Sequence, residues 1–149
     1  MKRRDFLAAA SAMPALAGQR GGRIRVALWG TEHSHTTGKL KAMRDSADYE
    51  VVGVCEPDAT LRSKAEKNPL FTGLRWMSES EMLSDGSIPL VVVECSVWDA
   101  IPMGSKVIAA GKHLHIEKPV GNDWPSYKAM VEQARAKKLL FQSGYVWRH

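Results

Sequence analysis

The stretch Gly111-Lys-His-Leu-His-Ile-Glu-Lys-Pro119 decides the fold of this chain. Gly111 is a helix stop, because a glycine accepts the left-handed conformation that commonly follows a last helical turn. A short strand over His113–Ile116 comes next, and Glu117-Lys118-Pro119 stands where that strand ends. Open α/β sheets bind ligands at the carboxyl ends of their parallel strands. We therefore expect Lys118 to lie over the ligand-binding edge of a sheet.

Strand-like and helix-like segments alternate from residue 23 onward, a pattern that predicts a parallel sheet with right-handed crossovers. The run Leu90-Val-Val-Val-Glu94 is typical of a strand that is buried on both faces. The other expected strands are 23–29, 49–55, 74–76, 113–116 and 139–144, and the expected helices are 34–45, 78–83, 99–110 and two that begin at Asp58 and Asp123. The sequence thus predicts one α/β domain over 18–149, a Rossmann-type doubly wound parallel sheet.

The composition is that of a soluble globular protein, with 44% hydrophobic and 25% charged residues among 149. The formal net charge is +5, but no Lys/Arg block with interleaved aromatic residues is present, so we expect no nucleic-acid partner. Cys55 and Cys95 are expected at the ends of two strands on either side of a shared neighbour. Two strand spacings separate them by about 9–10 Å, too far for a disulfide.

The sequence of residues 1–17 predicts a signal peptide. They have a basic start, an apolar run from Phe6 to Ala17 and the small-x-small site Ala15-Leu-Ala17. Arg3-Arg4-Asp5-Phe6-Leu7 also resembles the twin-arginine export motif. We expect cleavage after Ala17, a periplasmic location and no stable membrane anchor, since the apolar run is too short to span a bilayer. The alternative is a frayed basic tail.

Residues 107–119 resemble the Gfo/Idh/MocA family of NAD(P)-dependent oxidoreductases, and the similarity extends over residues 23–148. The resemblance implies that Lys118 contacts cofactor and substrate as the catalytic residue, with Glu117 beside the cofactor. It also implies an activity on the CH–OH group of a sugar or polyol. Family members continue into a second α/β domain that forms the substrate site and usually the oligomer interface. We therefore expect the 149-residue chain to be catalytically incomplete, and to oligomerise only in a full-length form.

The turn after the first expected strand is where a Rossmann fold binds pyrophosphate with Gly-x-Gly-x-x-Gly. Here the turn reads Gly30-Thr-Glu-His-Ser-His35 and keeps only the first glycine. Glu32, at the second glycine position, is electrostatically unfavourable beside a diphosphate, whereas the following helix N-terminus favours an anion. Protonated His33 or His35 would partly offset Glu32. The cofactor contacts expected from this turn are Gly30, Thr31, His33, Ser34 and His35.

Glu56 closes the second expected strand, 26 residues after Gly30. An acidic residue there accepts hydrogen bonds from the ribose diol and repels a 2′-phosphate, which favours NAD over NADP. The alternative is a solvated loop carboxylate. The end of the fourth strand departs from the family pattern: Cys95-Ser-Val-Trp-Asp-Ala100 stands where Thr-Pro-Asn-x-x-His is usual.

Other chemistries are less well supported by the sequence. The candidate metal ligands are His33 and His35 in the turn, and His113 and His115 on one face of a strand. A zinc site needs further converging ligands, so we expect no metal site. The absence of Gly-x-Ser-x-Gly argues against a serine hydrolase. Glu117 is expected either to tune the pKa of Lys118 or to form a plain surface ion pair with it. A non-catalytic nucleotide-binding or scaffold protein remains the alternative to an oxidoreductase domain, and Glu32 favours it.

Overall fold

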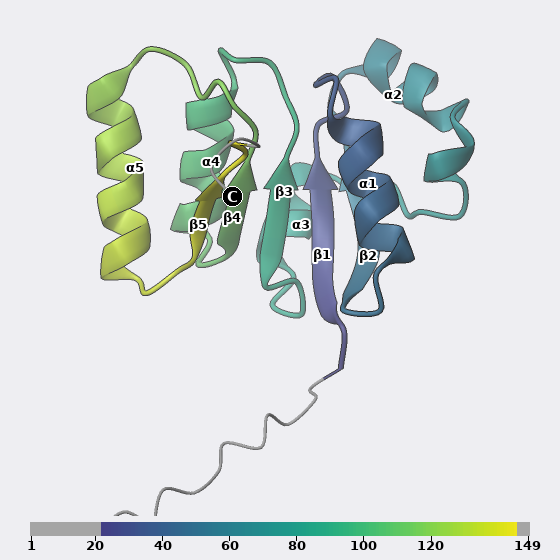
Figure 1. Cartoon of the computed structure of the whole chain (residues 1–149), viewed down its shortest axis with the longest axis horizontal. Helices are drawn as coiled ribbons and strands as arrows, with labels where there is room; N and C mark the ends of the chain where they lie inside the picture. The colour runs from purple at the N-terminus through teal and green to yellow at the C-terminus, as the bar shows by residue number, and fades with distance from the viewer. Residues whose placement is uncertain (1–21, 146–149) are drawn as a thin grey trace, which may run out of the picture.

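The computed structural model describes residues 22–145, which form a five-stranded parallel sheet flanked by helices (Figure 1). The spatial order of the strands is β2-β1-β3-β4-β5. The elements are β1 (Ile24–Trp29), α1 (Thr36–Asp45), β2 (Tyr49–Cys55), α2 (Ala59–Glu66), the 3-10 turn η1 (Pro69–Phe71), α3 (Glu79–Ser84), β3 (Leu90–Val93), α4 (Ala100–Ala109), β4 (His113–Ile116), α5 (Trp124–Ala136) and β5 (Phe141–Ser143). The predicted Rossmann-type α/β fold is confirmed. The expected signal peptide, 1–17, lies outside the described residues.

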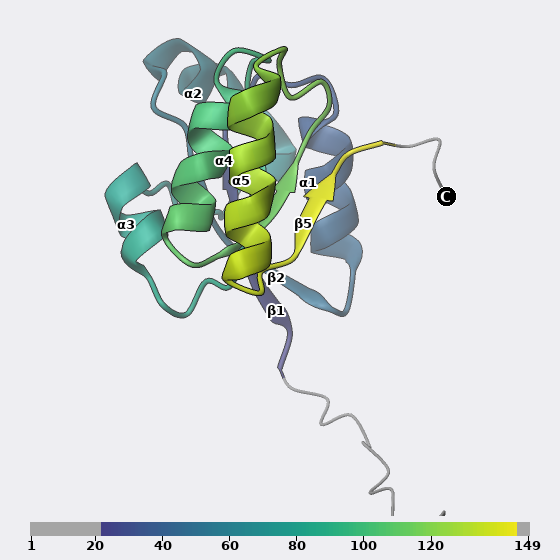
Figure 2. The same ribbon diagram turned by 90° about the vertical axis from the view of Figure 1, so that its left-hand side faces the viewer.

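The sheet is covered on both faces, as a doubly wound fold requires. Val26 and Leu28 of β1 pack with α1 in one core cluster, while Ala27 and Trp29 pack with α4 in the other. This division follows from the alternation of side chains along a strand. Figure 2 shows α3, α4 and α5 on one side of the sheet and α1 on the other.

The α1 face is covered unevenly. Within residues 22–145 no helix lies over β4 and β5 on this face (Figure 1). A hollow of about 670 Å³ borders β3, β4 and β5 there. The alternation of side chains along β4 matches this arrangement, because His113 and His115 line the hollow while Ile116 is fully buried. The two histidines therefore share one face, as the sequence predicts.

The expected third strand at 74–76 is wrong, because only one isolated parallel bridge forms there, between Val54 and Trp76. The N–H of Val54 donates to the Arg75 carbonyl at 2.8 Å, and the N–H of Met77 donates to the Val54 carbonyl at 2.9 Å. Pairing goes no further, since Gly73 turns the chain just before this segment with φ +78° and Ser78 caps α3 just after it.

The helix starts are mostly those that the capping residues predict. Asp58, Ser78 and Asp123 each accept a backbone N–H bond at the start of a helix. The helix expected from Ser34 instead begins at Thr36, because a turn in which the Thr36 N–H donates to the His33 carbonyl at 3.0 Å precedes it. Among the described residues, no helix combines the length and apolar character needed to cross a membrane.

Candidate functional site

The predicted site residues gather at the carboxyl edge of the sheet, but in two separate regions. Gly30 and Glu56 line a crevice at the ends of β1, β2 and β3. His33, His35 and Glu117 form a group of side chains at the ends of β1 and β4, beside the start of α1. The β1–α1 turn supplies residues to both regions.

The first region, which we call the acidic crevice, has a volume of about 640 Å³. It opens where the chain reverses its winding between β1 and β3, the topological switch point at which open α/β sheets bind ligands. The residues lining it are Trp29, Gly30, Glu32, Glu56, Pro57, Asp58, Thr60, Leu61, Glu79, Cys95, Asp99, Pro102, Met103 and Lys106.

Gly30 brings the β1–α1 turn against the end of β3. Its φ is +89°, a conformation that side-chain-bearing residues rarely adopt. A Cβ at this position would lie 2.7 Å from the carbonyl oxygen of Glu94. The one glycine retained from the phosphate-binding pattern is therefore needed for the turn itself.

Glu56 is buried, with 8% of its surface exposed, and its side chain links two loops by hydrogen bonds. Its Oε2 accepts the N–H of Thr31 at 2.7 Å and the hydroxyl of Thr31 at 2.8 Å. Its Oε1 accepts the N–H of Asp58 at 3.1 Å. The alternative of a solvated loop carboxylate is thus wrong, because this carboxylate holds the turn after β1 to the turn after β2.

The backbone amides of the β1–α1 turn are largely engaged within the protein. Besides the Thr31 N–H, the N–H of Gly30 donates to the Cys55 carbonyl at 2.8 Å. The N–H of His33 donates to the Glu94 carbonyl at 3.4 Å, and the N–H of His35 donates to Nδ1 of His33 at 3.1 Å. A diphosphate bound at this turn would compete with these bonds.

Carboxylates dominate the lining of the acidic crevice. The five acidic residues are Glu32, Glu56, Asp58, Glu79 and Asp99, against the single lysine Lys106. The Lys106 ammonium is 2.8 Å from a Glu79 carboxylate oxygen, so it neutralises one of them. Burial, with a smaller contribution from the charge of Asp99, raises the pKa of the Cys95 thiol to about 12. The crevice therefore disfavours additional negative charge.

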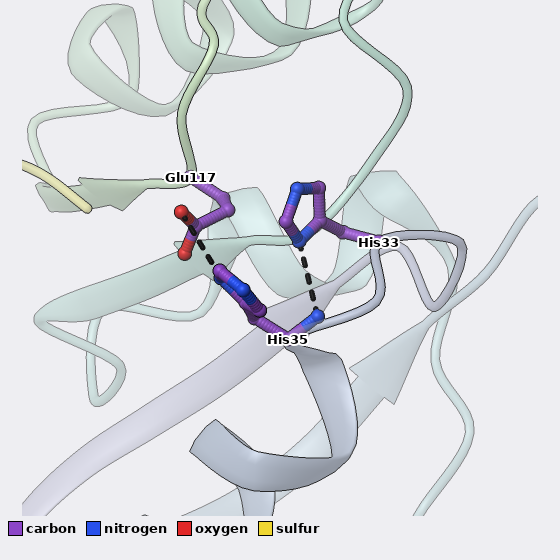
Figure 3. A group of neighbouring side chains, drawn as sticks. All are labelled: His33, His35 and Glu117. Atoms are coloured by element: carbon purple, nitrogen blue, oxygen red, sulfur yellow. Dashed lines mark hydrogen bonds and ion pairs between the residues drawn. The ribbon is translucent and has the colours of Figure 1, made fainter. Parts of the chain in front are cut away.

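The second region, which we call the histidine–carboxylate cluster, comprises His33, His35, Lys39, Glu94, His115 and Glu117. Figure 3 shows His33 and His35 reaching from the turn before α1 toward Glu117, which follows β4. Glu94 directly follows β3 and has no exposed surface. Parallel strands end at one edge, and this shared edge is what brings the cluster together.

Lys39 is the central cation of this cluster. Its Nζ lies 2.7 Å from Oε1 of Glu94 and donates to Oε2 of Glu117. It also lies 2.7 Å from Nε2 of His115. A lysine ammonium has only donors, so Nε2 of His115 must accept, and Nδ1 of His115 then donates to the side-chain oxygen of Gln142 at 3.1 Å.

The two turn histidines face the other oxygens of the same carboxylates. Nδ1 of His35 lies 3.4 Å from Oε1 of Glu117, and Nδ1 of His33 lies 3.7 Å from Oε2 of Glu94. The rings of His33 and His35 meet edge to face with centroids 4.9 Å apart. Oε2 of Glu94 is buried and has no hydrogen-bond partner among the described residues. One buried carboxylate oxygen is thus left unsatisfied in this cluster.

Burial and charge act in opposite directions on the two carboxylates. Burial raises the pKa of Glu94 despite the bond from Lys39. Burial also acts to raise the pKa of Glu117, but hydrogen bonds from Lys39 and from the Lys118 N–H outweigh it and leave that pKa below its usual value. Burial, followed by the charge of Lys39, lowers the pKa of His115, which keeps the ring neutral.

Lys118 follows β4 at the predicted edge and is half-buried. The expected ion pair between Glu117 and Lys118 is wrong, because the Glu117 carboxylate binds Lys39 and His35 instead. Its contact with Lys118 is with the backbone, whose N–H donates to Oε1 at 3.0 Å.

Sequence reasoning missed Lys39 and Glu94 as site residues. A charged residue at the end of the apolar run Leu90–Glu94 was one available signal, since charged residues are almost never fully buried unless they are paired. The spacing of His35 and Lys39 was another, because residues four apart share a face of a helix. Ser34 is exposed and borders another hollow, of about 520 Å³, with His35 and Glu117.

Residues 24–145 match the family model of the oxidoreductase family with an NAD-binding Rossmann fold, GFO_IDH_MocA. The chain belongs to the Gfo/Idh/MocA family. No sequence among the curated proteins matches it significantly.

Solved structures of similar fold place this Gfo/Idh/MocA domain within longer proteins. GenD2 from gentamicin A biosynthesis, in complex with NAD, superposes with a TM-score of 0.73 at 21% identity over 84% of this chain and 35% of its own. A second similar structure is a mutant of KijD10, a 3-ketoreductase from Actinomadura kijaniata, in complex with TDP-benzene and NADP. It superposes with a TM-score of 0.70 at 20% identity, and the match covers 83% of this chain and 38% of that protein. A candidate oxidoreductase from Yersinia pestis superposes with a TM-score of 0.70 at 27% identity, and the match covers 83% of this chain and 34% of that protein. The chain therefore spans about a third of the length of these relatives.

Proposed function

We propose that this chain is the NAD-binding domain of an oxidoreductase that moves hydride between a nicotinamide cofactor and the CH–OH carbon of a sugar or polyol. Membership of the family supports dinucleotide binding. The single observation on which the proposal rests is the acidic crevice at the switch point, with Gly30 and buried Glu56 in its lining. Open α/β sheets bind dinucleotides at this position.

NAD is the proposed cofactor, in preference to NADP. The proposed role of Glu56 is to accept hydrogen bonds from a ribose diol, and each carboxylate oxygen has acceptor capacity beyond the bonds it already makes. The surrounding carboxylates would repel a 2′-phosphate. Relatives with each cofactor are known, GenD2 with NAD and KijD10 with NADP.

Titration calorimetry with NAD and NADP tests this part of the proposal. We expect NAD to bind more tightly, and Glu56→Gln to weaken NAD binding and reduce the preference. Because Glu56 also braces the two loops, the variant's melting temperature serves as a check on folding. Binding of neither cofactor would favour the alternative of a non-catalytic scaffold protein, which the engaged turn amides and Glu32 support. A clear preference for NADP would contradict the assignment of Glu56.

Lys118 is proposed as the acid/base group of the full-length enzyme. It lies at the carboxyl edge, and a lysine in reach of the reacting hydroxyl can transfer a proton. Positioning of the substrate supplies much of the rate, so we expect the 149 residues alone to turn over no sugar or polyol. In a protein that includes the substrate domain, Lys118→Ala should lower kcat by roughly 10²–10⁴-fold. The matched control is Lys128→Ala on the exposed face of α5, which should leave kcat unchanged.

Export by the twin-arginine route is proposed for the whole protein, with cleavage after Ala17. The support is the order of Arg3-Arg4, an apolar run and a small-residue site. Changing Arg3 and Arg4 together to Lys should keep the protein in the cytoplasm. Unchanged fractionation of this double variant would argue for another route.

A further inference from the structure

The histidine–carboxylate cluster contains more buried negative charge than its one lysine neutralises. Glu94 and Glu117 are almost completely buried, with 0% and 4% of their surfaces exposed. Lys39 donates to Oε1 of Glu94 and to Oε2 of Glu117. The other two oxygens, Oε2 of Glu94 and Oε1 of Glu117, are the ones that face the histidines.

The unsatisfied oxygen of Glu94 is the observation that points to a ligand. A buried carboxylate oxygen without a partner is costly, because it has lost its water without gaining a hydrogen bond. This oxygen is fully buried and lies 3.7 Å from Nδ1 of His33. A cation between these two atoms would satisfy both the oxygen and the excess negative charge.

Two pairs of donor atoms have the spacing expected around a four-coordinate transition metal. Zinc–nitrogen and zinc–oxygen bonds of about 2.0–2.1 Å in a tetrahedron put neighbouring donor atoms about 3.3 Å apart. Nδ1 of His35 and Oε1 of Glu117 are 3.4 Å apart, and Nδ1 of His33 and Oε2 of Glu94 are 3.7 Å apart. Ligand atoms of His33, His35 and Glu117 all lie within 4.8 Å of one another (Figure 3).

We propose that Nδ1 of His33, Nδ1 of His35 and Oε1 of Glu117 form a site for a divalent transition metal of the zinc class, with Oε2 of Glu94 moving in from its position beside His33 as the fourth ligand. Lys39 then acts as a positioning residue, because it holds the outer oxygen of each carboxylate and leaves the inner one for the metal. His115 holds Lys39, and Gln142 holds His115 in the required tautomer. Outer hydrogen bonds of this kind orient metal ligands in proteins.

Coordination requires two local rearrangements. The Glu94 carboxylate must move toward the group of His33, His35 and Glu117, of which it is not a member, and one hydrogen bond must be replaced. Nδ1 of His33 accepts the N–H of His35 at 3.1 Å, and the metal would replace this bond. Oε1 of Glu117 accepts the Lys118 N–H and can keep it, since a carboxylate oxygen has two acceptor positions. The imidazole and carboxylate donor set suits zinc, cobalt, iron or manganese better than calcium or magnesium.

A second arrangement of the same residues is the competing model. Glu94, His115 and Glu117 also bring ligand atoms within 4.8 Å of one another, but their centre is the place of the Lys39 ammonium. A metal there would have to displace Lys39. The two models differ in their histidines, and this difference is what the experiment measures.

The experiment uses Co²⁺ as the probe with tag-free protein comprising the whole chain, in the absence of any dinucleotide. Failure to bind Co²⁺ is thereby distinguishable from failure of the proposed cofactor function. We expect one Co²⁺ per chain by equilibrium dialysis, with visible absorption bands of low-coordinate cobalt, and competition by Zn²⁺. Wild-type protein that binds no Co²⁺ would overturn the proposal without recourse to any variant.

The variants then assign the ligands. His33→Gln, His35→Gln and Glu94→Gln should each weaken Co²⁺ binding at least 10-fold and change the absorption bands. His113→Gln is the matched control, because His113 lies on β4 outside the cluster and its Nδ1 accepts the Leu140 N–H. The Co²⁺ affinity of this variant should be within about twofold of wild type. Loss of binding in His115→Gln, with wild-type binding in His33→Gln and His35→Gln, would place the metal at the Lys39 position and overturn the assignment.

Discussion

The acidic crevice and the histidine–carboxylate cluster share the β1–α1 turn but differ in the solvent exposure and the pairing of their carboxylates. In the crevice most carboxylates reach solvent, and its one lysine pairs with Glu79 through side chains that are about half exposed. In the cluster two carboxylates are removed from water and held by one lysine and the turn histidines. Solvent screens the first set of charges, whereas the second depends on protein groups alone. A single substitution in the cluster should therefore lower the stability of the protein more than one in the crevice.

The largest expected effect concerns the thiol in the acidic crevice. Because burial and Asp99 raise the pKa of Cys95 from 9.0 to about 12, its thiolate population in the folded protein should be about 1000-fold below that of a free thiol. Alkylation by iodoacetamide at pH 8, followed by mass spectrometry, should be slow in buffer and fast in urea. Rapid labelling of Cys95 in the folded protein would show that the crevice does not disfavour an additional negative charge.

The same shift predicts how stability depends on pH. A thiol whose pKa is higher in the folded protein contributes stability below pH 9, and this contribution is lost as the pH rises from 9 to about 12. Cys95→Ser should flatten that part of the stability curve, measured by urea unfolding at each pH. An unchanged slope in this variant would assign the alkaline loss to other groups.

Lys39→Met compares the two regions directly. Loss of the cation leaves Glu94 and Glu117 buried without their ion pair, and the free energy of unfolding should fall by about 3 kcal/mol. Lys106→Met removes the lysine of the crevice, whose pair with Glu79 is exposed, and should cost less than about 1 kcal/mol. Urea unfolding of metal-free protein measures both. Equal losses would mean that the cluster is no more tightly coupled than the crevice.

Gly30→Ala tests the turn that the two regions share. The new Cβ would meet the Glu94 carbonyl at 2.7 Å in a left-handed conformation, so the protein should lose about 2 kcal/mol of stability. Gly38→Ala is the matched control within α1, where a Cβ would meet nothing within 4 Å, and it should stabilise the helix by about 0.5–1 kcal/mol. Thermal unfolding would contradict the structural role of Gly30 if the two variants melted alike.

Glu32→Gln should have the smallest effect and acts on the crevice alone. Removal of one exposed carboxylate near the expected diphosphate should tighten NAD binding by about 1 kcal/mol, roughly fivefold. Glu50→Gln at the amino end of β1–β2 pairing removes the same charge far from the crevice and should leave the affinity as it is. Calorimetry at low salt compares the two. An equal gain from both variants would indicate a diffuse charge effect and no particular role for Glu32.

Local sequence determined the strands, the helix caps and the residues at the ends of strands. Glu56, Glu117 and Lys118 could be placed at the carboxyl edge because strand periodicity and turn residues depend only on near neighbours. The tertiary structure decided which of these side chains meet. Lys39 reaches Glu94, His115 and Glu117 across 55, 76 and 78 residues. These contacts follow from the order and register of β1, β3 and β4, which no local pattern specifies. Glu117 and Lys118 are neighbours in sequence, yet the Glu117 carboxylate pairs with the distant Lys39 and His35.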